Sequence, residues 1–269
     1  MSTEKIQFKQ EKETLLATLY ARALESRSPD PILRDEMSED AIRCIDYDFE
    51  RLKVDQRSIA MRAKLFDLWT MDFLKEHPNG IVLNLGCGLD SRIYRINPPD
   101  NVLWFDIDFP EVIELRHRLF PKRAGYEMIG SSLANRQFLA SIPHHRPAWI
   151  MLEGVTMYLT KAIMEPLLQD LTNQFPSGGI AFDAIGPAAI RMARGNRSIR
   201  KTGATFGGFS IDDPGELKMI APKLEFVEDA RTPNLPGYTK LPLMMRALVR
   251  VFDTFPSLRK LSRILRYRF

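Results

Sequence analysis

The middle of the chain alternates short apolar runs with amphipathic stretches, and this rhythm constrains the fold more than any other feature. Between residues 80 and 186 the runs lack polar alternation, which is typical of strands buried on both faces. Strands separated by helical stretches are the pattern of βαβ units and a parallel sheet. We therefore predict an α/β fold with strands at Ile81–Leu85, Val102–Phe105, Tyr126–Ile129, Trp149–Leu152 and Ile180–Ala184.

The flanking regions are expected to complete a single domain over residues 1–269, which offer ample chain for one core. Residues 10–76 read as mostly helical. Neither an internal repeat nor an obvious linker divides the chain. We expect three parts: an N-terminal helical cap (1–78), a core (79–186), and a lid with C-terminal strands (187–269).

The C-terminal third carries weaker signals than the core. Residues 187–215 have little periodicity and are predicted to form a loop or lid. A short helix is expected within 215–230, followed by a strand at Leu224–Val227. Ser262–Phe269 is predicted to be a last strand that pairs with it. Pro166 lies inside a predicted helix, where proline is unfavourable.

The first predicted strand runs into a turn that contains Gly86 and Gly88. Glycines adopt backbone angles that other residues avoid and allow a ligand to approach closely. Ligands of doubly wound sheets bind at the carboxyl ends of the strands, so we expect a nucleotide-like cofactor over this turn. The alternative is a tight strand-to-helix turn that binds nothing. A dinucleotide fingerprint would have a third glycine where this chain has Ser91, which disfavours NAD.

Two carboxylates, Asp106 and Asp108, end the second predicted strand, 18 and 20 residues after Gly88. An acid at this point can accept hydrogen bonds from both hydroxyls of a ribose. A strand-end acid can also cap the following helix, and Asp108 before Phe109 and Pro110 is well placed to do so. Both roles remain open from the residues alone.

Arg62 lies on the apolar face of a predicted helix, Asp55–Glu76. Residues 59, 66, 69 and 73 of that helix are apolar and share the face. A guanidinium there needs an anion, because an unpaired buried charge is costly. A ligand carboxylate held by two hydrogen bonds would satisfy it. The alternatives are an internal salt bridge or a side chain that reaches water at the edge of the face.

A carboxylate and a glycine, Glu153 and Gly154, follow the fourth predicted strand. They lie at the edge of the sheet where the cofactor is expected, so Glu153 is a candidate cofactor contact. The alternative is an acid favoured by the positive end of a helix dipole. Tyr158 is expected either to line a substrate cavity or to belong to the core.

Taken together, these motifs resemble the leucine carboxyl methyltransferase family of class I S-adenosylmethionine-dependent methyltransferases. Within it, the closest branch resembles bacterial O-methyltransferases of the tetracenomycin polyketide type. The resemblance covers roughly residues 10–186 in unbroken order. The stretches that carry it are Ala21-Arg-Ala-Leu-Glu-Ser, Pro29-Asp-Pro-Ile-Leu, Asp46-Tyr-Asp-Phe, Arg62-Ala-Lys-Leu-Phe-Asp, Asn84-Leu-Gly-Cys-Gly-Leu-Asp-Ser-Arg, Asp106-Ile-Asp-Phe-Pro and Glu153-Gly-Val-Thr-Met-Tyr-Leu.

The resemblance implies a Rossmann-like sheet of seven strands, mostly parallel with an antiparallel last strand, plus N-terminal helices and a lid. It also implies S-adenosylmethionine as the cofactor. Arg62 matches the arginine that binds the methionyl carboxylate, while Gly86 and Gly88 match the glycines that cradle the cofactor. Glu153 matches the family's acid at the cofactor.

For the nucleoside, the resemblance implies that Asp108 binds the ribose, with Asp106 as second choice. Where the family often has an acid near the adenine, this chain has Ser132, followed by Leu133. A serine hydroxyl can hydrogen-bond a base edge, but the charge-assisted bond of a carboxylate would be lost. We therefore expect either weaker cofactor binding or recognition of adenine by backbone groups.

The implied reaction is methyl transfer to an oxygen of a small-molecule acceptor, a carboxylate or a phenol, possible substrates including polyketides. A carboxylate is ionised at neutral pH and needs no general base, whereas a phenol, with a pKa near ~10, would benefit from one. The four histidines lie outside the motifs, and no Cys/His cluster has the spacing of metal ligands. We therefore nominate neither a catalytic base nor a metal.

A basic stretch within residues 187–210 is our candidate for a lid over the acceptor. We expect its charges to hold an acidic acceptor, and the alternative is a solvated basic helix. The side chains concerned are Arg191, Arg194, Arg197, Arg200, Lys201, Phe206 and Phe209.

The net charge of +4 is concentrated in one segment of the chain. Residues 240–269 hold eight bases and one acid, and the other 239 residues hold 30 bases and 33 acids. No nucleic-acid-binding module accompanies the excess, so we expect no nucleic-acid partner. The segment Leu241–Leu265 mixes apolar residues with arginines, which is typical of helices that bind membrane surfaces.

Two further expectations concern the setting of the protein. The N-terminal residues MSTEKIQFKQEKET are polar, no apolar run is long enough to span a bilayer, and Cys44 and Cys87 make a poor disulfide framework. These features predict a cytoplasmic location. The rival functions are an NAD-dependent oxidoreductase on the same fold and a peripheral membrane-binding module, and the oligomeric state stays open.

Overall fold

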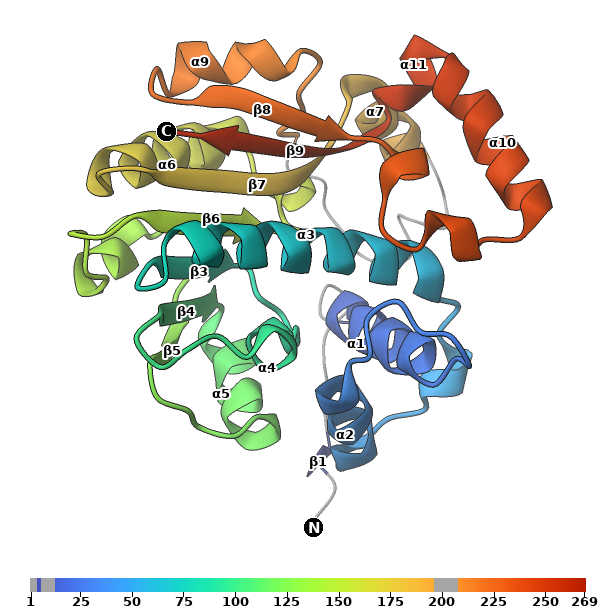
Figure 1. The fold of residues 1–269 in the computed structure, drawn as a ribbon, viewed down its shortest axis with the longest axis horizontal. Helices are drawn as coiled ribbons and strands as arrows, with labels where there is room; N and C mark the ends of the chain where they lie inside the picture. Colours follow the sequence, from blue (N-terminus) through green and yellow to red (C-terminus); the bar gives the residue numbers. More distant parts are fainter. Residues whose placement is uncertain (1–3, 6–12, 196–207) are drawn as a thin grey trace.

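The computed structural model describes residues 4–5, 13–195 and 208–269, and its centre is a seven-stranded sheet (Figure 1). The strand order is β5-β4-β3-β6-β7-β9-β8. Its first five strands are parallel, as the apolar runs predict. They are β3 (Ile81–Leu85), β4 (Leu103–Asp108), β5 (Tyr126–Gly130), β6 (Ala148–Leu152) and β7 (Gly178–Ile185).

The two remaining strands, β8 (Glu225–Ala230) and β9 (Ser262–Arg268), complete the sheet. β9 lies between β7 and β8 and is antiparallel to both, which confirms the predicted pairing of the last strand. β8 extends three residues beyond the predicted end at Val227 and has an irregular register between Phe226 and Glu228. It is an edge strand, so polar residues are tolerated there.

Helices and short turns surround the sheet. The α-helices are α1 (Glu13–Ser26), α2 (Glu36–Cys44), α3 (Gln56–Glu76), α4 (Arg92–Ile96), α5 (Pro110–Leu119), α6 (Lys161–Gln174), α7 (Pro187–Gly195), α9 (Leu217–Ile220), α10 (Leu243–Thr254) and α11 (Pro256–Arg259). The 3-10 turns are η2 (Phe49–Arg51), η3 (Arg136–Ser141), η4 (Thr156–Tyr158), η5 (Pro214–Glu216), η6 (Thr232–Asn234) and η7 (Tyr238–Lys240). Two short strands, β1 (Glu4–Lys5) and β2 (Ile45–Asp46), form a separate parallel pair.

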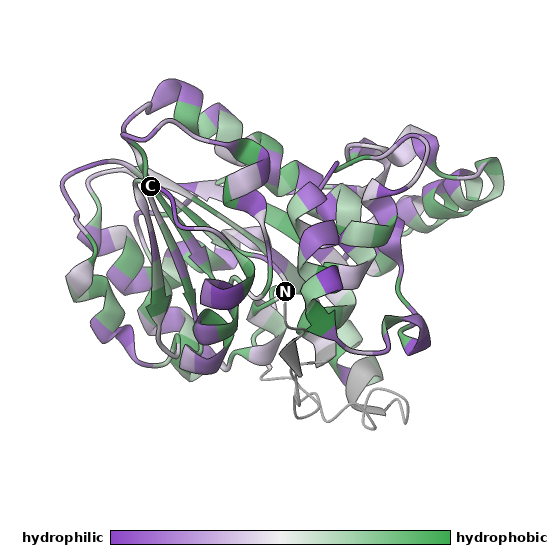
Figure 2. Cartoon of the chain, turned by 90° about the horizontal axis from the view of Figure 1, so that it is seen from below, coloured by the Kyte–Doolittle hydropathy of each residue, from purple (hydrophilic) through white to green (hydrophobic). Residues whose placement is uncertain are grey.

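Apolar layers on both faces of the sheet hold the fold together (Figure 2). On one face Trp69 and Phe73 of α3 pack against Trp149 and neighbouring strand residues. On the other face α6 contributes Leu167 and Leu171 to the largest buried cluster. Burying each such side chain contributes about 1.5–3 kcal/mol, so these layers fix the positions of the strand ends. Helix α3 begins after Asp55, whose carboxylate accepts a hydrogen bond from the Ser58 N–H.

The region after β7 differs from the sequence prediction. We expected a loop or lid from residue 187, but residues 187–195 form helix α7. Pro187 opens this helix, where its missing N–H is not needed, and the two alanines that follow favour it. Phe209 is buried in the large core cluster instead of standing at a surface. The proposed lid residues Arg197, Arg200, Lys201 and Phe206 lie outside the described residues, as does the side chain of Arg194.

Candidate active site

The predicted cofactor edge of the sheet carries the glycine turn between β3 and α4. Gly86 and Gly88 have φ angles of +70° and +51°, in the region that favours glycine. A Cβ at Gly86 would collide with Val155, and one at Gly88 would lie 2.8 Å from Leu15 of α1. The turn is therefore closely packed beneath the N-terminal helices, and larger residues would distort it.

Asp106, the second-choice ribose acid, is buried among protein partners. Its carboxylate forms an ion pair with Arg116 and accepts hydrogen bonds from Trp104 Nε1 at 2.9 Å and from the Tyr126 hydroxyl at 2.6 Å. Arg116 in turn donates from Nη1 to the carbonyl oxygens of Gly88 and Asp90, both at 2.8 Å. Asp106 thus orients Arg116, which holds the glycine turn by its backbone carbonyl oxygens.

Asp108, the first choice, lies at the end of β4 facing the glycine turn. One oxygen accepts a hydrogen bond from the Gly88 N–H and the other from the Phe109 N–H, each at 2.7 Å. Burial raises the pKa of this carboxyl, although the two N–H groups favour its ionised form. Each carboxylate oxygen has a second lone pair, so Asp108 can still accept bonds from a ligand hydroxyl.

Arg62 points from α3 to the ends of β6 and β7. Its Nε donates to Glu153 at 2.9 Å and its Nη1 to Asp183 at 2.7 Å, so the internal salt bridge is present. Its Nη2 hydrogen-bonds to none of the described residues and faces Gly154, where a Cβ would lie 3.4 Å away. The side chain keeps 24% of its surface exposed, which leaves Nη2 available to a ligand.

Below Arg62 a group of buried charges joins four elements of the fold. Arg92 is fully buried and pairs with Asp67 at 2.7 Å, Asp90 at 2.8 Å and Glu153 at 2.5 Å. Arg95, also buried, extends the group to Asp35 at 2.7 Å. We call Arg22, Arg62, Arg92 and Arg95, with Asp35, Asp67, Asp90, Glu153 and Asp183, the charge network.

Within the charge network, the acids that face Arg62 differ in their protonation behaviour. Burial would raise the pKa of Glu153, but Arg92 and Arg62 outweigh it and hold this pKa below its usual range. Burial raises the pKa of Asp183, and Arg62 only partly offsets the rise. Asp183 also accepts the Gly154 N–H at 2.6 Å, so it ties the turn after β6 to the arginine.

Asp183 was missed because the sequence reading treated residues 180–184 only as a strand. Its signal was a single carboxylate in an otherwise apolar strand, which is costly unless it is paired. Asp90 and Arg92 were likewise read only as parts of the motif after Gly88. Their partners come from α1, from α3 and from the turn after β6, which local sequence patterns do not bring together.

The predicted adenine and pocket residues lie around the same edge. Ser132 follows β5, and its hydroxyl oxygen accepts the Ala134 N–H at 3.3 Å. Leu133 is buried in the large core cluster. Tyr158, in turn η4 after Gly154, is 38% exposed. These positions are compatible with the predicted roles, which stay predictions.

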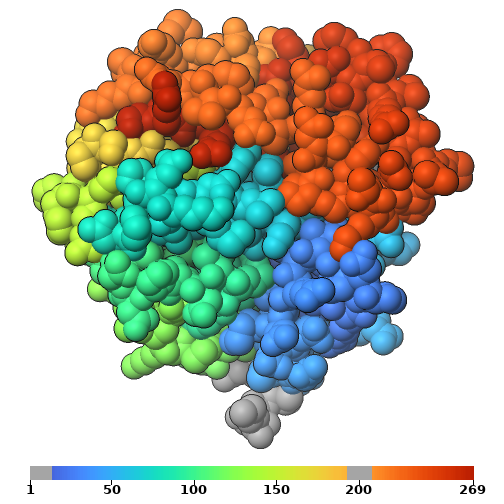
Figure 3. Space-filling view, in the orientation of Figure 1, coloured from blue at the N-terminus to red at the C-terminus, as the bar shows by residue number. Residues whose placement is uncertain are grey.

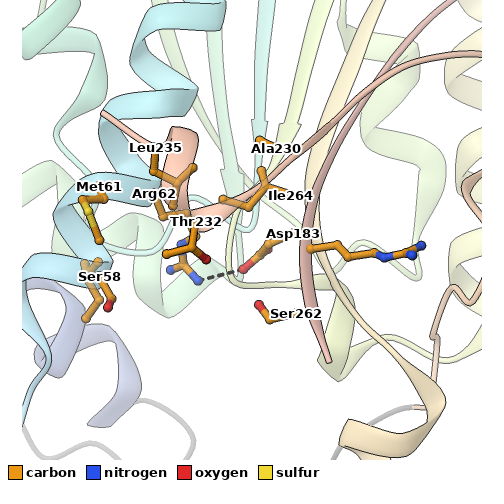
Figure 4. A pocket seen from close by; sticks show the side chains of 11 residues that line it. Ser58, Met61, Arg62, Asp183, Ala230, Thr232, Leu235, Ser262 and Ile264 are labelled. Carbon is orange, nitrogen blue, oxygen red and sulfur yellow. Dashed lines mark hydrogen bonds and ion pairs between the residues drawn. The ribbon is translucent and has the colours of Figure 1, made fainter. Parts of the chain in front are cut away.

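A cavity of about 250 Å³ opens beside the Arg62–Asp183 pair (Figure 4). The Arg62–Asp183 ion pair forms part of its wall, and Thr232 and Ser262 lie nearby. The remaining lining residues come from α3, β8, η6 and β9 and are largely apolar. Gly86, Gly88 and Asp108 do not line it, and Arg62 is the predicted cofactor residue that does.

Metal ligation has no candidate at this site. Across residues 4–5, 13–195 and 208–269, no three His, Cys, Asp or Glu side chains are grouped to hold an ion. The buried acids of the charge network are satisfied by arginines instead.

The seven-stranded order, the positive-φ glycines and the strand-end acid define a Rossmann-like nucleotide-cofactor enzyme of the class I methyltransferase type. Comparison with known proteins agrees. The leucine carboxyl methyltransferase family profile matches residues 15–172, so this chain belongs to that family. It is an S-adenosylmethionine-dependent methyltransferase, and the NAD-dependent oxidoreductase alternative is set aside.

Among similar proteins is the tetracenomycin polyketide synthesis O-methyltransferase TcmP of Streptomyces glaucescens, 42% identical over 96% of each chain. The S-adenosyl-L-methionine-dependent methyltransferase dpfgK of Gibberella zeae is 32% identical over 80% of each. The structure is also similar to a DUF574 family protein from Streptomyces avermitilis, with a TM-score of 0.57 and 13% identity, covering 97% of this chain and 99% of that one. This last likeness concerns the fold alone.

Proposed function

We propose that this methyltransferase transfers the methyl group of S-adenosylmethionine to an oxygen of a small polyketide-type molecule, at a carboxylate or a phenol. The observation that carries the proposal is the 42% identity to a polyketide synthesis O-methyltransferase along 96% of both chains. A likeness of that extent includes the region after residue 187, where acceptor selection is expected. The geometry of the site supports the proposal at several points.

The residues at the sheet edge fit S-adenosylmethionine. The cofactor carries a carboxylate, which Nη2 of Arg62 can bind while Glu153 and Asp183 hold the guanidinium in place. Asp108 is oriented by two N–H groups to accept bonds from ribose hydroxyls. The compact turn at Gly86 and Gly88 lets the backbone approach the cofactor. Asp106 is assigned to holding Arg116 and the turn.

The chemistry that the cofactor supplies is an electrophilic methyl group on a sulfonium. The protein's part is to align the acceptor oxygen with that group and to exclude water, and alignment alone contributes several kcal/mol. A carboxylate acceptor arrives ionised and needs no base. A carboxylate acceptor therefore requires no proton transfer by the protein, whereas a phenol would lose its proton to water or to a base as the methyl group is transferred.

The cavity beside Arg62 is our candidate for the acceptor site. Its lining combines apolar side chains, which suit a carbon skeleton, with polar ones, and the hydroxyls of Ser58, Thr232 and Ser262 offer hydrogen bonds to oxygen substituents. It shares Arg62 and Asp183 with the cofactor side, so an acceptor there would lie next to the methionyl end.

The test separates the two halves of the proposal. Calorimetry with S-adenosylhomocysteine measures cofactor binding, and a labelled-methyl assay with a panel of aromatic polyketides, carboxylic acids and phenols, followed by mass spectrometry, identifies the product. Arg62→Gln should weaken cofactor binding about 10- to 100-fold, since charge-assisted hydrogen bonds contribute roughly 1.5–3 kcal/mol. Arg57→Gln, on the exposed side of the same helix, is the matched control and should bind normally.

Ser262→Ala addresses the acceptor half. It should raise the acceptor KM several-fold while leaving cofactor affinity unchanged. Normal cofactor affinity of Arg62→Gln would refute the assignment of Arg62 to the cofactor carboxylate. Methylation at a nitrogen or carbon of the true acceptor would refute O-methyl transfer. An unchanged acceptor KM of Ser262→Ala would refute the cavity as the acceptor site.

A further inference from the structure

Helix α10 presents its apolar face to solvent instead of to the protein. Seven large apolar side chains on and beside it are between 47% and 83% exposed: Leu243, Met244, Met245, Leu248, Val251, Phe252 and Phe255. Most recur at the spacing of one helical face. Against the protein body lie Val249 and, half-buried, Arg246 and Asp253. Isolated exposed apolar residues are ordinary, but a contiguous group of this size marks a binding surface.

The position of α10 leaves this face open. The helix lies at the periphery of the molecule, away from the sheet (Figure 1), and its residues form part of the orange surface of the C-terminal region (Figure 3). The connection to the body runs through η6 and through the small cluster of Met61, Tyr238 and Leu241. The Tyr238 hydroxyl donates to the Arg246 carbonyl oxygen at 2.7 Å, which fixes the helix on its polar side.

The size of the face argues against a second copy of the chain as its occupant. A stable protein–protein interface takes about 20–30 residues from each partner. The α10 face offers seven. An occupant that needs only one apolar stripe, inserted to a shallow depth, fits this area better.

The charge around α10 identifies the chemistry of that occupant. Residues 240–260 contain five bases and a single acid, Asp253. Three of these bases form ion pairs within the chain: Lys240 with Asp30, Arg259 with Asp253 and Lys260 with Asp212. Arg250 is exposed and has no ion pair among the described residues, so it is available to an anionic headgroup. Arg246 lies over the Tyr238 ring with its Nε buried, so it faces the protein body on the side of the helix opposite the apolar stripe. An apolar stripe with arginines on the polar side is the arrangement of helices that bind anionic bilayer surfaces.

We propose that α10 docks the enzyme on an anionic lipid surface, with Met244, Leu248 and Phe252 inserted among the acyl chains. The helix lies in the surface and does not cross it. Its 12 residues span ~18 Å, whereas the hydrocarbon core is about 30 Å thick. In the parts of the chain that the structure describes, no helix is long and apolar enough to cross a bilayer.

The test uses the full chain, because β9 lies inside the sheet and a truncation before it would unfold the protein. Cosedimentation is measured with vesicles of phosphatidylcholine alone and of phosphatidylcholine mixed equally with phosphatidylglycerol. The wild type should bind the anionic vesicles and lose binding as salt is raised. The double variant Leu248→Asn/Phe252→Asn should bind them at least about tenfold more weakly, because two apolar side chains that would insert among the acyl chains become polar.

Two controls keep the result specific. Met219→Asn removes an 81% exposed methionine on α9, far from α10 in sequence, and should bind like the wild type. Circular dichroism and S-adenosylhomocysteine binding should be unchanged in every variant. Failure of the wild type to bind anionic vesicles at low salt would overturn the proposal. So would a homodimer in light scattering that Leu248→Asn/Phe252→Asn dissociates, or capture of an acidic protein in place of lipid.

Discussion

The charge network and helix α10 break the usual distribution of side chains in opposite directions. Arg92, Arg95 and Asp35 are charged and buried, whereas Met244 and Leu248 are apolar and exposed. Interiors normally exclude charge and surfaces normally carry few contiguous apolar groups. In the network, every arginine pairs with acids of the chain, so these charges are balanced largely within the protein, and Nη2 of Arg62 is left for a ligand. No described residue packs on the apolar stripe of α10, so we expect this stripe to contact another surface.

Arg92→Met tests the first half of this comparison and has the largest expected effect. It leaves Asp67, Asp90 and Glu153 short of a buried partner, so the free energy of unfolding should fall by about 3–5 kcal/mol. Urea denaturation measures the change. Arg43→Met, which removes an exposed ion pair with Asp40 on α2, should cost less than about 1 kcal/mol. Equal effects would mean that the buried network contributes no more than a surface pair.

Acid should weaken the charge network by protonating Asp35, and the variant Asp35→Asn measures how much stability the ionised carboxylate contributes. Burial would raise the pKa of Asp35, but Arg95 and Arg22 outweigh it and hold this pKa below its ordinary value of 3.8. The ionised group therefore stabilises the fold above pH 3.8 and loses this contribution as the pH falls below that value. The difference in unfolding free energy between wild type and Asp35→Asn should be about 1–3 kcal/mol near neutrality.

The pH dependence distinguishes charge from shape in that experiment. The stability difference between the two proteins should shrink in urea titrations below pH 3.8, because Asp35 of the unfolded wild type takes up a proton before Asp35 of the folded protein does. A difference that stays constant across this range would assign the role of Asp35 to its hydrogen bonds with Ser38 and Ser91 alone.

Leu248→Asn tests the other half and has the smallest expected effect. Because Leu248 is 54% exposed, its replacement should change the free energy of unfolding by less than about 0.5 kcal/mol. Leu167→Asn in α6, whose side chain is fully buried, is the matched contrast and should be strongly destabilising. A loss of several kcal/mol in Leu248→Asn would show that the α10 face packs within the protein.

The same contrast explains how far the sequence could predict the molecule. The strand at Ile81–Leu85 was predicted to the residue because a run buried on both faces is a local signal. Arg62 was singled out because a charge on an apolar helix face is also local, and the structure confirms an ion-paired arginine at that position. Its role toward the cofactor remains a proposal.

What the sequence did not reveal depends on partners distant in the chain. Asp183 was read as strand, although it receives Arg62 across 121 positions. The separation of Asp106 from Asp108 follows from Arg116 and Tyr126, which come from α5 and β5. Helix α7 was read as loop because the stretch 187–215 as a whole shows little periodicity, and a helix of nine residues is too short to stand out within it. Exposed apolar residues on α10 carry a normal amphipathic pattern, and only the structure shows which way that pattern faces.

The place of β9 in the sheet has a consequence for the order in which the protein can assemble. β9 is synthesised after β8, yet it lies between β7 and β8, and within the described part of the chain it is the only sheet neighbour of β8. While the ribosome is still making residues 231–261, β8 has no strand to join and β7 has an open edge. Open edges promote pairing with other chains, so this interval is when a nascent chain is most exposed to aggregation.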